Sequence, residues 1–547
     1  MLRYFRMHRR LSIFLIILGL VKAELPIANT PIGRYRGTIT ESRLGKTIYS
    51  FTGIRFAEPP VGELRFQPPV PIGCHEGVYN ATIDAPLCPQ PSVYKTQEDC
   101  LYLNVYTTKL PTKYDNNVKK PVIVFIHPGG FYSSGSRFWG PRYFLDRDIV
   151  LVTINYRLGS LGFLATGEKE SPGNNGFKDQ VVALKWVKKN IAAFGGDPGL
   201  VTIMGDSAGG ISVVLHMLSP MSIGLFHRAA ALSGSPTSHV LIGHDELDLA
   251  KRQARYVGCP DDTPSNIYNC LKTVSAEDLG NSLGKFAEFG GDPLLIWRVV
   301  IEKDFGQERF LTGHPITLIK NNKILTKVPF MTGITKDEFG QRAFFVLNNQ
   351  TRLDRLNNEW YQTAPIPFFY ERNTSYSKVI SKDLRKFYFN NQIIDSSQAD
   401  NLGHLYSDSH VGFGANRGVK LMSEHNPLPS FYYRYSYQGS YSFYYYPNSN
   451  NKTFGVVHMD DLIYIFSIPT GRFPIFNATE PEEIEITEKL TSNPTPTIDS
   501  KLDNVIWKTF NSKTQTFLDI GKKLVNRERL YERRYEEWEK LFPLSFY

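Results

Sequence analysis

A five-residue pattern directly after an apolar run constrains this sequence more than any other feature. Residues 201–204 form a short apolar run, and Gly205, Ser207 and Gly209 follow it with the spacing G-x-S-x-G. After a buried strand this spacing favours a sharp turn into a helix that raises the serine above the backbone. The helix N-terminus then favours developing negative charge. The pattern predicts a nucleophilic serine, although Gly and Ser also serve in ordinary turns.

Strand-like apolar runs alternate with helical patterns through most of the 547 residues. The clearest runs cover residues 121–127, 149–157, 201–204 and 328–335. Between two of them, one helical face gathers Val181, Leu184, Val187, Ile191 and Phe194. This alternation predicts an α/β fold with a large, mostly parallel central sheet and helices on both faces. Without a low-complexity linker or internal repeat, residues 24–547 are expected to form one domain.

The first 23 residues have the layout of a secretory signal peptide. Four arginines precede the apolar run 11–21, and the small residue Ala23 closes the segment. Eleven apolar residues are too few to span a bilayer, so a cleaved leader is favoured over a retained anchor. The C-terminus carries no lipid-anchor or retention signal. We therefore expect a secreted, extracellular protein with no membrane anchor.

Charge and cysteine content fit that compartment. The formal net charge is +9, but five basic residues and no acid lie in the leader, which leaves about +4, too little and too scattered for nucleic acid. Cys88 with Cys100 and Cys259 with Cys270 are candidate disulfides, and Cys74 is left over, either buried or available for pairing. The spacings match no zinc site. Five sequons are candidate glycosylation sites: Asn80, Asn349, Asn373, Asn451 and Asn477.

A serine nucleophile needs a base and an oriented acid. Of the twelve histidines, His458 has the most informative surroundings, with small apolar residues before it and two acids after it. A strand ending near residue 335 delivers Asp337 and Glu338 into a loop, and either carboxylate is a candidate partner. All three residues are also compatible with ordinary structural or solvated roles.

A second glycine-rich turn supplies candidate donors for an oxyanion. The apolar run 121–127 ends in Pro128, Gly129 and Gly130, and proline has no N–H to donate. The donors are therefore expected to be the N–H groups of Gly129 and Gly130, together with that of Ala208 after the serine. A plain turn is the alternative.

Seven motifs in one order resemble the carboxylesterase/cholinesterase family, and most closely its secreted insect carboxylesterases. They are EDCLYLNVY (98–106), HPGGFY (127–132), NYRLGSLGFL (155–164), FGGDPG (194–199), GDSAGG (205–210), GITKDE (333–338) and GVVHMDDLIYIF (455–466). The resemblance implies an α/β-hydrolase fold with a catalytic triad of Ser207, Glu338 and His458, and it selects Glu338 over Asp337. It implies no metal and no cofactor.

The same resemblance implies further roles. Gly129, Gly130 and Ala208 take the oxyanion-hole positions, and Cys88–Cys100 and Cys259–Cys270 are the family's disulfides. Asp206 and Asp461 stand where relatives carry acids that support the imidazolium. The sequence departs from the family in having Pro128 where glycine is usual, and in a shortened segment near residues 485–495. A closing helix with Leu524, Tyr531, Tyr535, Trp538 and Leu541 on one face is expected to pack on the core.

These observations predict a secreted serine carboxylic-ester hydrolase that cleaves small neutral esters through an acyl-enzyme. Cholinesterases hold a cation over a tryptophan between their first two disulfide cysteines, but the loop 89–99 has no tryptophan and only Tyr94 as a weak substitute. Two alternatives stay open: a catalytically inactive adhesion or matrix protein, and an esterase specific for a hormone or odorant ester. Either a monomer or a homodimer is compatible with the sequence.

Overall fold

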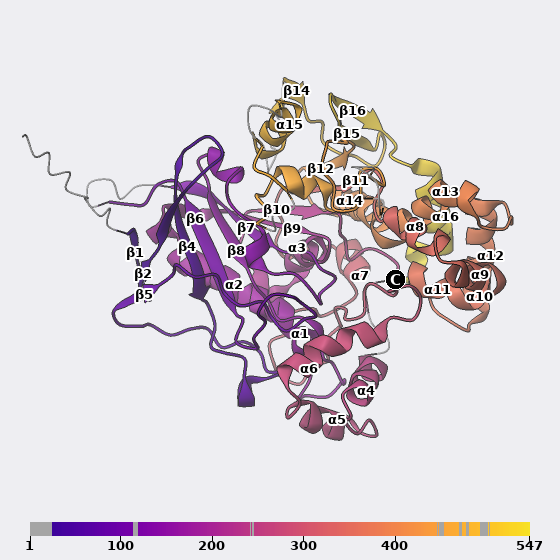
Figure 1. Ribbon diagram of the computed structural model, residues 1–547, viewed down its shortest axis with the longest axis horizontal. Helices are drawn as coiled ribbons and strands as arrows, with labels where there is room; N and C mark the ends of the chain where they lie inside the picture. The colour runs from indigo at the N-terminus through magenta and orange to yellow at the C-terminus, as the bar shows by residue number, and fades with distance from the viewer. Residues whose placement is uncertain are drawn as a thin grey trace, which may run out of the picture.

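A central eleven-stranded sheet organises the computed structural model (Figure 1). The structure describes residues 25–112, 119–240, 242, 246–445, 447, 453–469, 473–476, 481–492, 501–502 and 504–547. Across the sheet the strands run in the order β16 (Leu524–Glu528), β15 (Thr516–Ile520), β12 (Ser430–Tyr435), β11 (Phe330–Thr335), β10 (Arg228–Leu232), β9 (Gly196–Asp206), β7 (Lys120–Ile126), β8 (Val150–Ile154), β6 (Tyr102–Thr107), β4 (Thr47–Arg55) and β3 (Thr38–Glu41).

Seven neighbouring strands, from β15 to β8, are parallel, and the strands at both margins are antiparallel. All five residues of β8 and all six of β11 are buried, as expected for strands covered on both faces. The predicted α/β class and mostly parallel sheet are therefore confirmed. The four apolar runs correspond to β7, β8, β9 and β11.

Two small sheets flank the large one. The first joins β1 (Ile27–Thr30), β2 (Gly33–Arg36) and β5 (Val78–Asn80), at the left of Figure 1. The second is a hairpin of β13 (Lys501–Leu502) and β14 (Val505–Ile506).

Apolar residues on alternate positions of β7 point to two different cores. Val122, Val124 and Ile126 belong to one cluster of buried side chains, and Ile123 and Phe125 belong to another. The period of two places successive side chains on opposite faces of the sheet, so each face has its own core.

Helices cover both faces of the sheet (Figure 1). The main ones are α2 (Asn175–Asn190), α3 (Ala208–Leu218), α4 (Glu246–Tyr256), α5 (Pro264–Leu271), α9 (Gln350–Asn358), α12 (Ser375–Phe389), α13 (Ala399–Ser407), α14 (Phe413–His425), α15 (Pro481–Ser492) and α16 (Glu532–Leu541). Val181, Leu184 and Val187 of the expected helical face are buried on α2. The α-helix ends at Asn190, so Ile191 and Phe194 are buried on the 3-10 turn that follows.

The expected closing helix is only partly correct. It begins at Glu532, and Tyr535, Trp538 and Leu541 are its buried residues. Leu524 instead starts strand β16, which pairs antiparallel with β15 at the edge of the sheet. Arg529 and Tyr531 adopt positive φ angles of 57° and 47°, which breaks any helix that would join the two segments.

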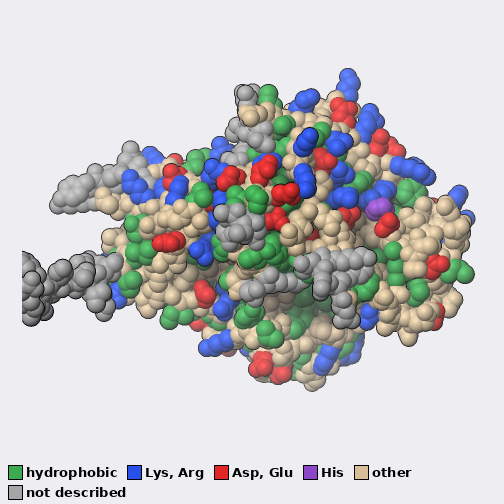
Figure 2. Space-filling view, turned by 45° about the horizontal axis from the view of Figure 1, so that its top comes forward, with side chains coloured by type: hydrophobic (Ala, Val, Ile, Leu, Met, Phe, Trp, Pro, Cys, Tyr) green, Lys and Arg blue, Asp and Glu red, His purple; other side chains and the backbone are tan. Residues whose placement is uncertain are grey.

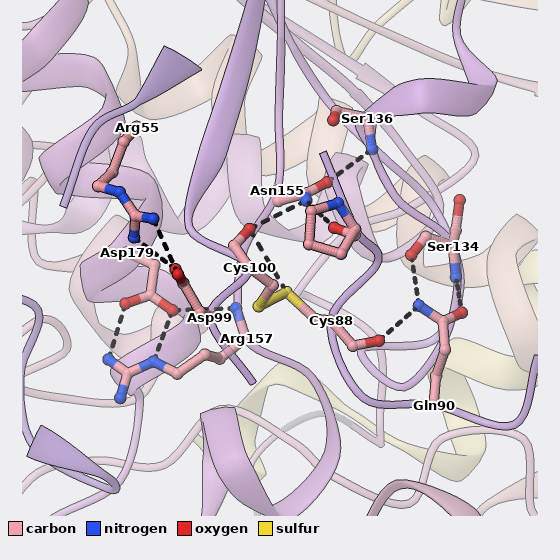
Figure 3. Close-up of a disulfide and its surroundings, with 11 residues drawn as sticks. Arg55, Cys88, Gln90, Asp99, Cys100, Ser134, Ser136, Asn155, Arg157 and Asp179 are labelled. Carbon is pink, nitrogen blue, oxygen red and sulfur yellow. Dashed lines mark hydrogen bonds and ion pairs between the residues drawn. A yellow bond between two sulfur atoms is a disulfide. The ribbon is translucent and has the colours of Figure 1, made fainter. Parts of the chain in front are cut away.

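Both expected disulfides are present. Cys88–Cys100 lies near Asn155, whose side-chain amide donates to the Cys100 carbonyl oxygen at 3.0 Å (Figure 3). Cys259–Cys270 links the turn after α4 to α5. Cys74, the remaining cysteine, is exposed rather than buried.

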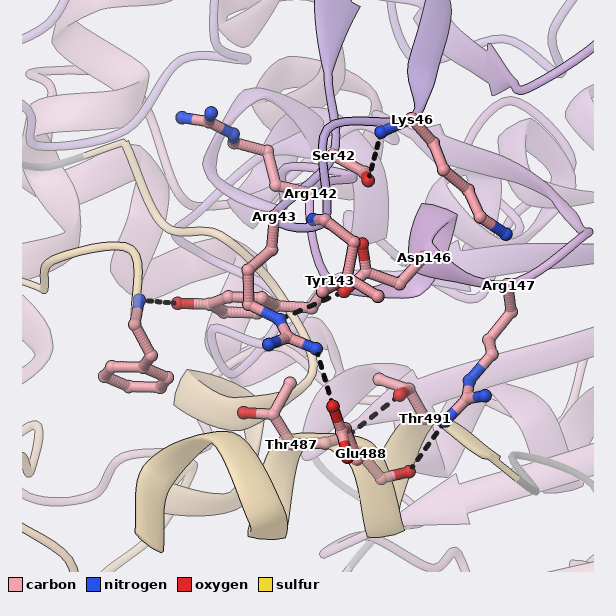
Figure 4. A network of polar contacts seen from close by, with 12 residues as sticks. Ser42, Arg43, Lys46, Arg142, Tyr143, Asp146, Arg147, Thr487, Glu488 and Thr491 are labelled. Carbon is pink, nitrogen blue, oxygen red and sulfur yellow. Dashed lines mark hydrogen bonds and ion pairs between the residues drawn. The ribbon is translucent and has the colours of Figure 1, made fainter. Parts of the chain in front are cut away.

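A long-range ion-pair network attaches α15 to the N-terminal half of the chain (Figure 4). Arg43 contacts Asp146 at 3.0 Å and Glu488 of α15 at 3.2 Å. Arg147 donates to the Glu488 carbonyl oxygen at 3.4 Å. The shortened segment near residues 485–495 therefore begins on helix α15, which contacts Arg43 and Arg147 through Glu488.

Candidate active site

Ser207 occupies the sharp turn between β9 and α3. Its φ and ψ angles are 55° and −117°, a conformation that L-residues rarely adopt and that is typical of functional sites. Side chains on the flanking glycines would not fit, because a Cβ on Gly209 would lie 2.0 Å from the Ile126 carbonyl oxygen. A Cβ on Gly205 would lie 2.4 Å from the backbone of Gly209. Close packing of the backbone therefore holds the serine in its strained, partly exposed position.

The carboxyl ends of four neighbouring parallel strands bring the candidate residues to one edge of the sheet. In spatial order, β7 leads to Gly129, β9 to Ser207, β10 to Ser233 and β11 to Glu338. This edge is where open α/β sheets bind their ligands. Residues that are far apart in the sequence thus meet around Ser207.

His458 and Glu338 form a direct contact. The Nδ1 atom of His458 lies 2.6 Å from Oε2 of Glu338, and Glu338 is fully buried. The other carboxylate oxygen, Oε1, accepts hydrogen bonds from Ser233 Oγ at 2.5 Å and from the Thr335 N–H at 2.9 Å. Because a carboxylate only accepts, Nδ1 carries the proton, and Nε2 of the neutral ring has the free lone pair that a base requires.

Asp337 has a different partner. Its Oδ2 accepts a hydrogen bond from the Val456 N–H at 2.9 Å, two residues before His458. Asp337 thereby ties down the loop that carries the histidine, whereas Glu338 contacts the imidazole itself. The structure brings only the second of the two candidate acids to the histidine.

The N–H groups of Gly129, Gly130 and Ala208 donate no hydrogen bond to any protein group that the structure describes. Gly129 and Gly130 follow β7, and Ala208 is the first residue of α3. A Cβ on Gly130 would lie 3.3 Å from the Leu294 carbonyl oxygen, so this turn lies close to the backbone of Leu294. Three donors that remain available near a serine fit the stabilisation of an oxyanion.

His127 stabilises the turn that carries Gly129 and Gly130. Its ring stacks on Tyr156 with centroids 4.3 Å apart, and the Tyr156 hydroxyl donates to the His127 carbonyl oxygen at 3.0 Å. Burial lowers the pKa of His127 to about 4, so its ring is neutral near pH 7. The Pro128 carbonyl oxygen accepts a hydrogen bond from His127 Nδ1 at 2.7 Å, and Pro128 itself has no N–H to donate.

Asp206 and Asp461 form a buried acidic pair beside this centre. Neither carboxylate oxygen of Asp206 has a hydrogen-bond partner in the described part of the chain, whereas Asp461 accepts from the Tyr433 hydroxyl at 3.2 Å. Burial first, and then the charges of Asp461 and Glu338, raise the pKa of Asp206 well above its ordinary value. Burial and Glu338 also raise the pKa of Asp461. The pair therefore favours a protonated carboxyl next to Ser207.

Several residues of this site were absent from the sequence predictions. Ser233 binds Glu338, Tyr433 binds Asp461, and Phe339 stacks on the His458 ring. Ser233 follows a parallel strand and Phe339 follows Glu338, so both could be suspected from their places in the sequence. Tyr433 sits within β12, and no local pattern indicates its contact.

A family model described as "Carboxylesterase family" matches residues 24–538. The chain belongs to the carboxylesterase family. It is 36% identical over 472 residues to Esterase FE4 of Myzus persicae, covering 84% of this chain and 82% of that protein. It is also 36% identical over 467 residues to the juvenile hormone esterase of Tribolium castaneum, covering 81% of this chain and 79% of that protein.

Among solved structures, juvenile hormone esterase from Manduca sexta with OTFP covalently attached has the same fold. Its TM-score is 0.82 at 26% identity, and the match covers 95% of this chain and 100% of that one. This carboxylesterase is accordingly a carboxylic-ester hydrolase with an α/β-hydrolase fold.

Other sequence predictions concern the surface and the termini. Asn80, Asn349 and Asn373 are exposed, as glycosylation requires, whereas Asn451 and Asn477 lie outside the described residues, as does the expected signal peptide. Acidic and basic side chains are interspersed over the face shown in Figure 2. Within the described chain, no helix is long and apolar enough to cross a membrane, and no group of three potential ligands could hold a metal ion.

Proposed function

We propose that this carboxylesterase is a secreted enzyme that cleaves neutral esters through an acyl-enzyme formed on Ser207. The contact between His458 and the buried Glu338, together with the strained turn at Ser207, carries this proposal. His458 Nε2 removes the serine proton as Oγ attacks the ester carbonyl. The alcohol leaves with the proton from His458, and water then attacks the acyl-enzyme with the same residue as its base. The bond between the acyl carbon and Ser207 Oγ breaks, the acid leaves, and His458 returns the proton to Ser207.

Charge develops at two places during this reaction. The N–H groups of Gly129, Gly130 and Ala208 stabilise the oxyanion, and Glu338 stabilises the imidazolium. Asp461 lies within electrostatic range of His458 and supports the same positive charge. Asp206 acts less directly, because the charged groups that act on its carboxyl are Asp461 and Glu338. No step requires a metal or an organic cofactor.

Secretion is supported by the leader-like first 23 residues, by two disulfides and by three exposed sequons. We place residues 24–547 in one catalytic domain. A hormone-specific esterase is the second candidate, since two of the similar proteins are juvenile hormone esterases. An inactive adhesion protein is disfavoured because the chain keeps Ser207, Glu338 and His458, and His458 contacts Glu338.

The test is labelling with a fluorescent fluorophosphonate together with turnover of naphthyl acetate. The parent enzyme should be labelled once per chain, and Ser207→Ala should lose labelling and several orders of magnitude of kcat/KM while remaining folded. Ser92→Ala, which alters an exposed serine, serves as the matched control. Labelling of Ser207→Ala at the parental level would reject the proposal.

A further inference from the structure

Phe339 contacts the rings of two histidines next to the candidate acid. Its ring stacks on His458 with centroids 4.2 Å apart and planes inclined by 27°. It also contacts the His410 ring at 4.8 Å. We infer that Phe339 is a positioning residue: its aromatic face orients the His458 imidazole and stabilises the imidazolium that forms during turnover. This inference rests on the proposed role of His458 as the base.

The backbone of Phe339 supports this inference. Its φ angle is 52°, in the left-handed region that bulky residues rarely adopt, and such strain concentrates at functional sites. The turn is held by hydrogen bonds from the Gly340 N–H to the Asp337 carbonyl oxygen at 3.0 Å and from the Arg342 N–H to the Phe339 carbonyl oxygen at 2.9 Å. One strained turn therefore presents both the Glu338 carboxylate and the Phe339 ring to the same imidazole.

The stacking geometry suits a cation. A positive group within about 6 Å of an aromatic centroid is attracted by the negative face of the ring. The 4.2 Å stack lies well inside this range. A neutral imidazole gains less than an imidazolium from such a face, so the contact favours the charged form that follows proton transfer from Ser207.

His410 adds no positive charge to the stack. Its Nδ1 donates to the Tyr406 carbonyl oxygen at 2.9 Å, and Nε2 is buried without a hydrogen-bond partner among the described residues. Burial first, and then the nearby Arg342, lower the pKa of His410 well below its ordinary value. Arg342 is itself paired with the buried Asp292 at 2.5 Å. Phe339 consequently has a neutral neighbour in His410.

Other charged groups also face His458 and must stay constant in a test. Glu338 comes from the loop after β11, Asp461 from the turn Asp460–Tyr464, and His410 from the π-helical turn Asp408–Gly412. Asp206 acts on this set through Asp461 and Glu338. Substitutions at Phe339 change none of these titratable groups, so a comparison of pH–rate profiles tests the contribution of the ring.

The first experiment compares the pH–rate profiles of Phe339→Leu and Phe339→Tyr with that of the parent. For Phe339→Leu we expect kcat/KM for naphthyl acetate to fall about two- to thirtyfold, the range of a cation–π contact. The midpoint of the acidic limb should move to lower pH by about 0.4 to 1.5 pH units, since losing a contact to the charged form makes the imidazole less basic. Phe339→Tyr, which keeps the aromatic face, should have the parental kcat/KM and the parental acidic midpoint.

Phe389→Leu is the matched control, because Phe389 is a buried aromatic residue on α12 that packs edge-on against Trp360. Its thermal stability should fall while the acidic midpoint stays at the parental pH. A Phe339→Leu profile with the parental midpoint, or a Phe339→Tyr profile as shifted as that of Phe339→Leu, would overturn the inference.

A second experiment tests the same contact if Phe339→Leu does not fold. Phe339 is replaced by phenylalanine analogues with one and then three ring fluorines, which keep the shape but weaken the negative face. The acidic midpoint should fall with each addition, and an unchanged midpoint would refute the cation contact. His458→Ala separates the two proposals: if fluorophosphonate labelling survives in it, the base assignment fails, whereas loss of labelling with flat fluorine data rejects only the role of Phe339.

Discussion

Nδ1 of His458 lies 2.6 Å from Oε2 of Glu338, while Asp337, one residue earlier, bonds to the backbone of Val456. Two acids in the same short loop thus have separate partners. The two acids have different partners because adjacent side chains leave the loop in different directions. Only Glu338 accepts hydrogen bonds from the Ser233 hydroxyl and the Thr335 N–H.

This separation predicts unequal effects of two neighbouring substitutions. Glu338→Gln should lower kcat by several orders of magnitude, because an amide cannot neutralise the imidazolium and can fix the wrong tautomer. Asp337→Asn, the matched control, should keep kcat within about tenfold and act mainly on stability, since it weakens one hydrogen bond to Val456. Steady-state kinetics and thermal melts of both variants provide the measurement. The reverse order of kcat values would contradict the assignment.

The acidic pair predicts a pH-dependent gain in stability for Asp206→Asn. The pKa of Asp206 is raised in the folded state, so its contribution to stability is present below the ordinary value of about 3.9 and is lost as pH rises through the folded pKa. Asparagine does not titrate. The melting temperature of Asp206→Asn relative to the parent should therefore increase between pH 4 and pH 8.

The exposed Asp262 provides the control for that experiment. Its pKa is lowered mainly by a hydrogen bond from Asn266, so Asp262→Asn should show no growing gain with pH. A difference for Asp206→Asn that shrinks toward pH 8 would show that Asp206 is stabilised as a carboxylate.

The close packing under Ser207 predicts that Gly209→Ala is poorly tolerated. Its new Cβ would lie 2.0 Å from the Ile126 carbonyl oxygen, and backbone cannot yield as a flexible side chain does. We expect a loss of about 1 to 3 kcal/mol in the free energy of unfolding, with a large fall in kcat as the turn shifts. At Gly284 an added Cβ meets nothing within 4 Å, so Gly284→Ala should stay within about 0.5 kcal/mol. Equal denaturant midpoints for the two variants would refute this reasoning.

The substrate proposal predicts no preference for a cationic alcohol. The loop 89–99 has no tryptophan, and Tyr94 packs against Phe138 with Arg137 above its ring, which places a protein cation on the candidate aromatic face. Butyrylcholine should therefore have no higher kcat/KM than its uncharged isostere 3,3-dimethylbutyl butyrate, and naphthyl acetate should be a good substrate. A preference of about tenfold or more for the cation, some 1.4 kcal/mol, would reveal a cation site elsewhere.

The sequence by itself determined the local features of this carboxylesterase. The apolar runs became the buried strands β7, β8, β9 and β11, and the glycines around Ser207 became the close-packed turn. These predictions succeed because hydrophobic period and glycine geometry act over a few neighbouring residues. The order of seven motifs extended the local evidence to the whole fold.

Only the tertiary structure decided how distant residues meet. The positions of Glu338 and Asp337 relative to His458, the buried pair Asp206–Asp461 and the stack of Phe339 all depend on packing between segments more than one hundred residues apart. The C-terminal segment also depends on tertiary packing, because Leu524 fits a helical pattern yet lies on strand β16, which pairs with β15 at the edge of the sheet. Local patterns set which face of an element is apolar, but burial, strand pairing and charge proximity set which partner that face meets.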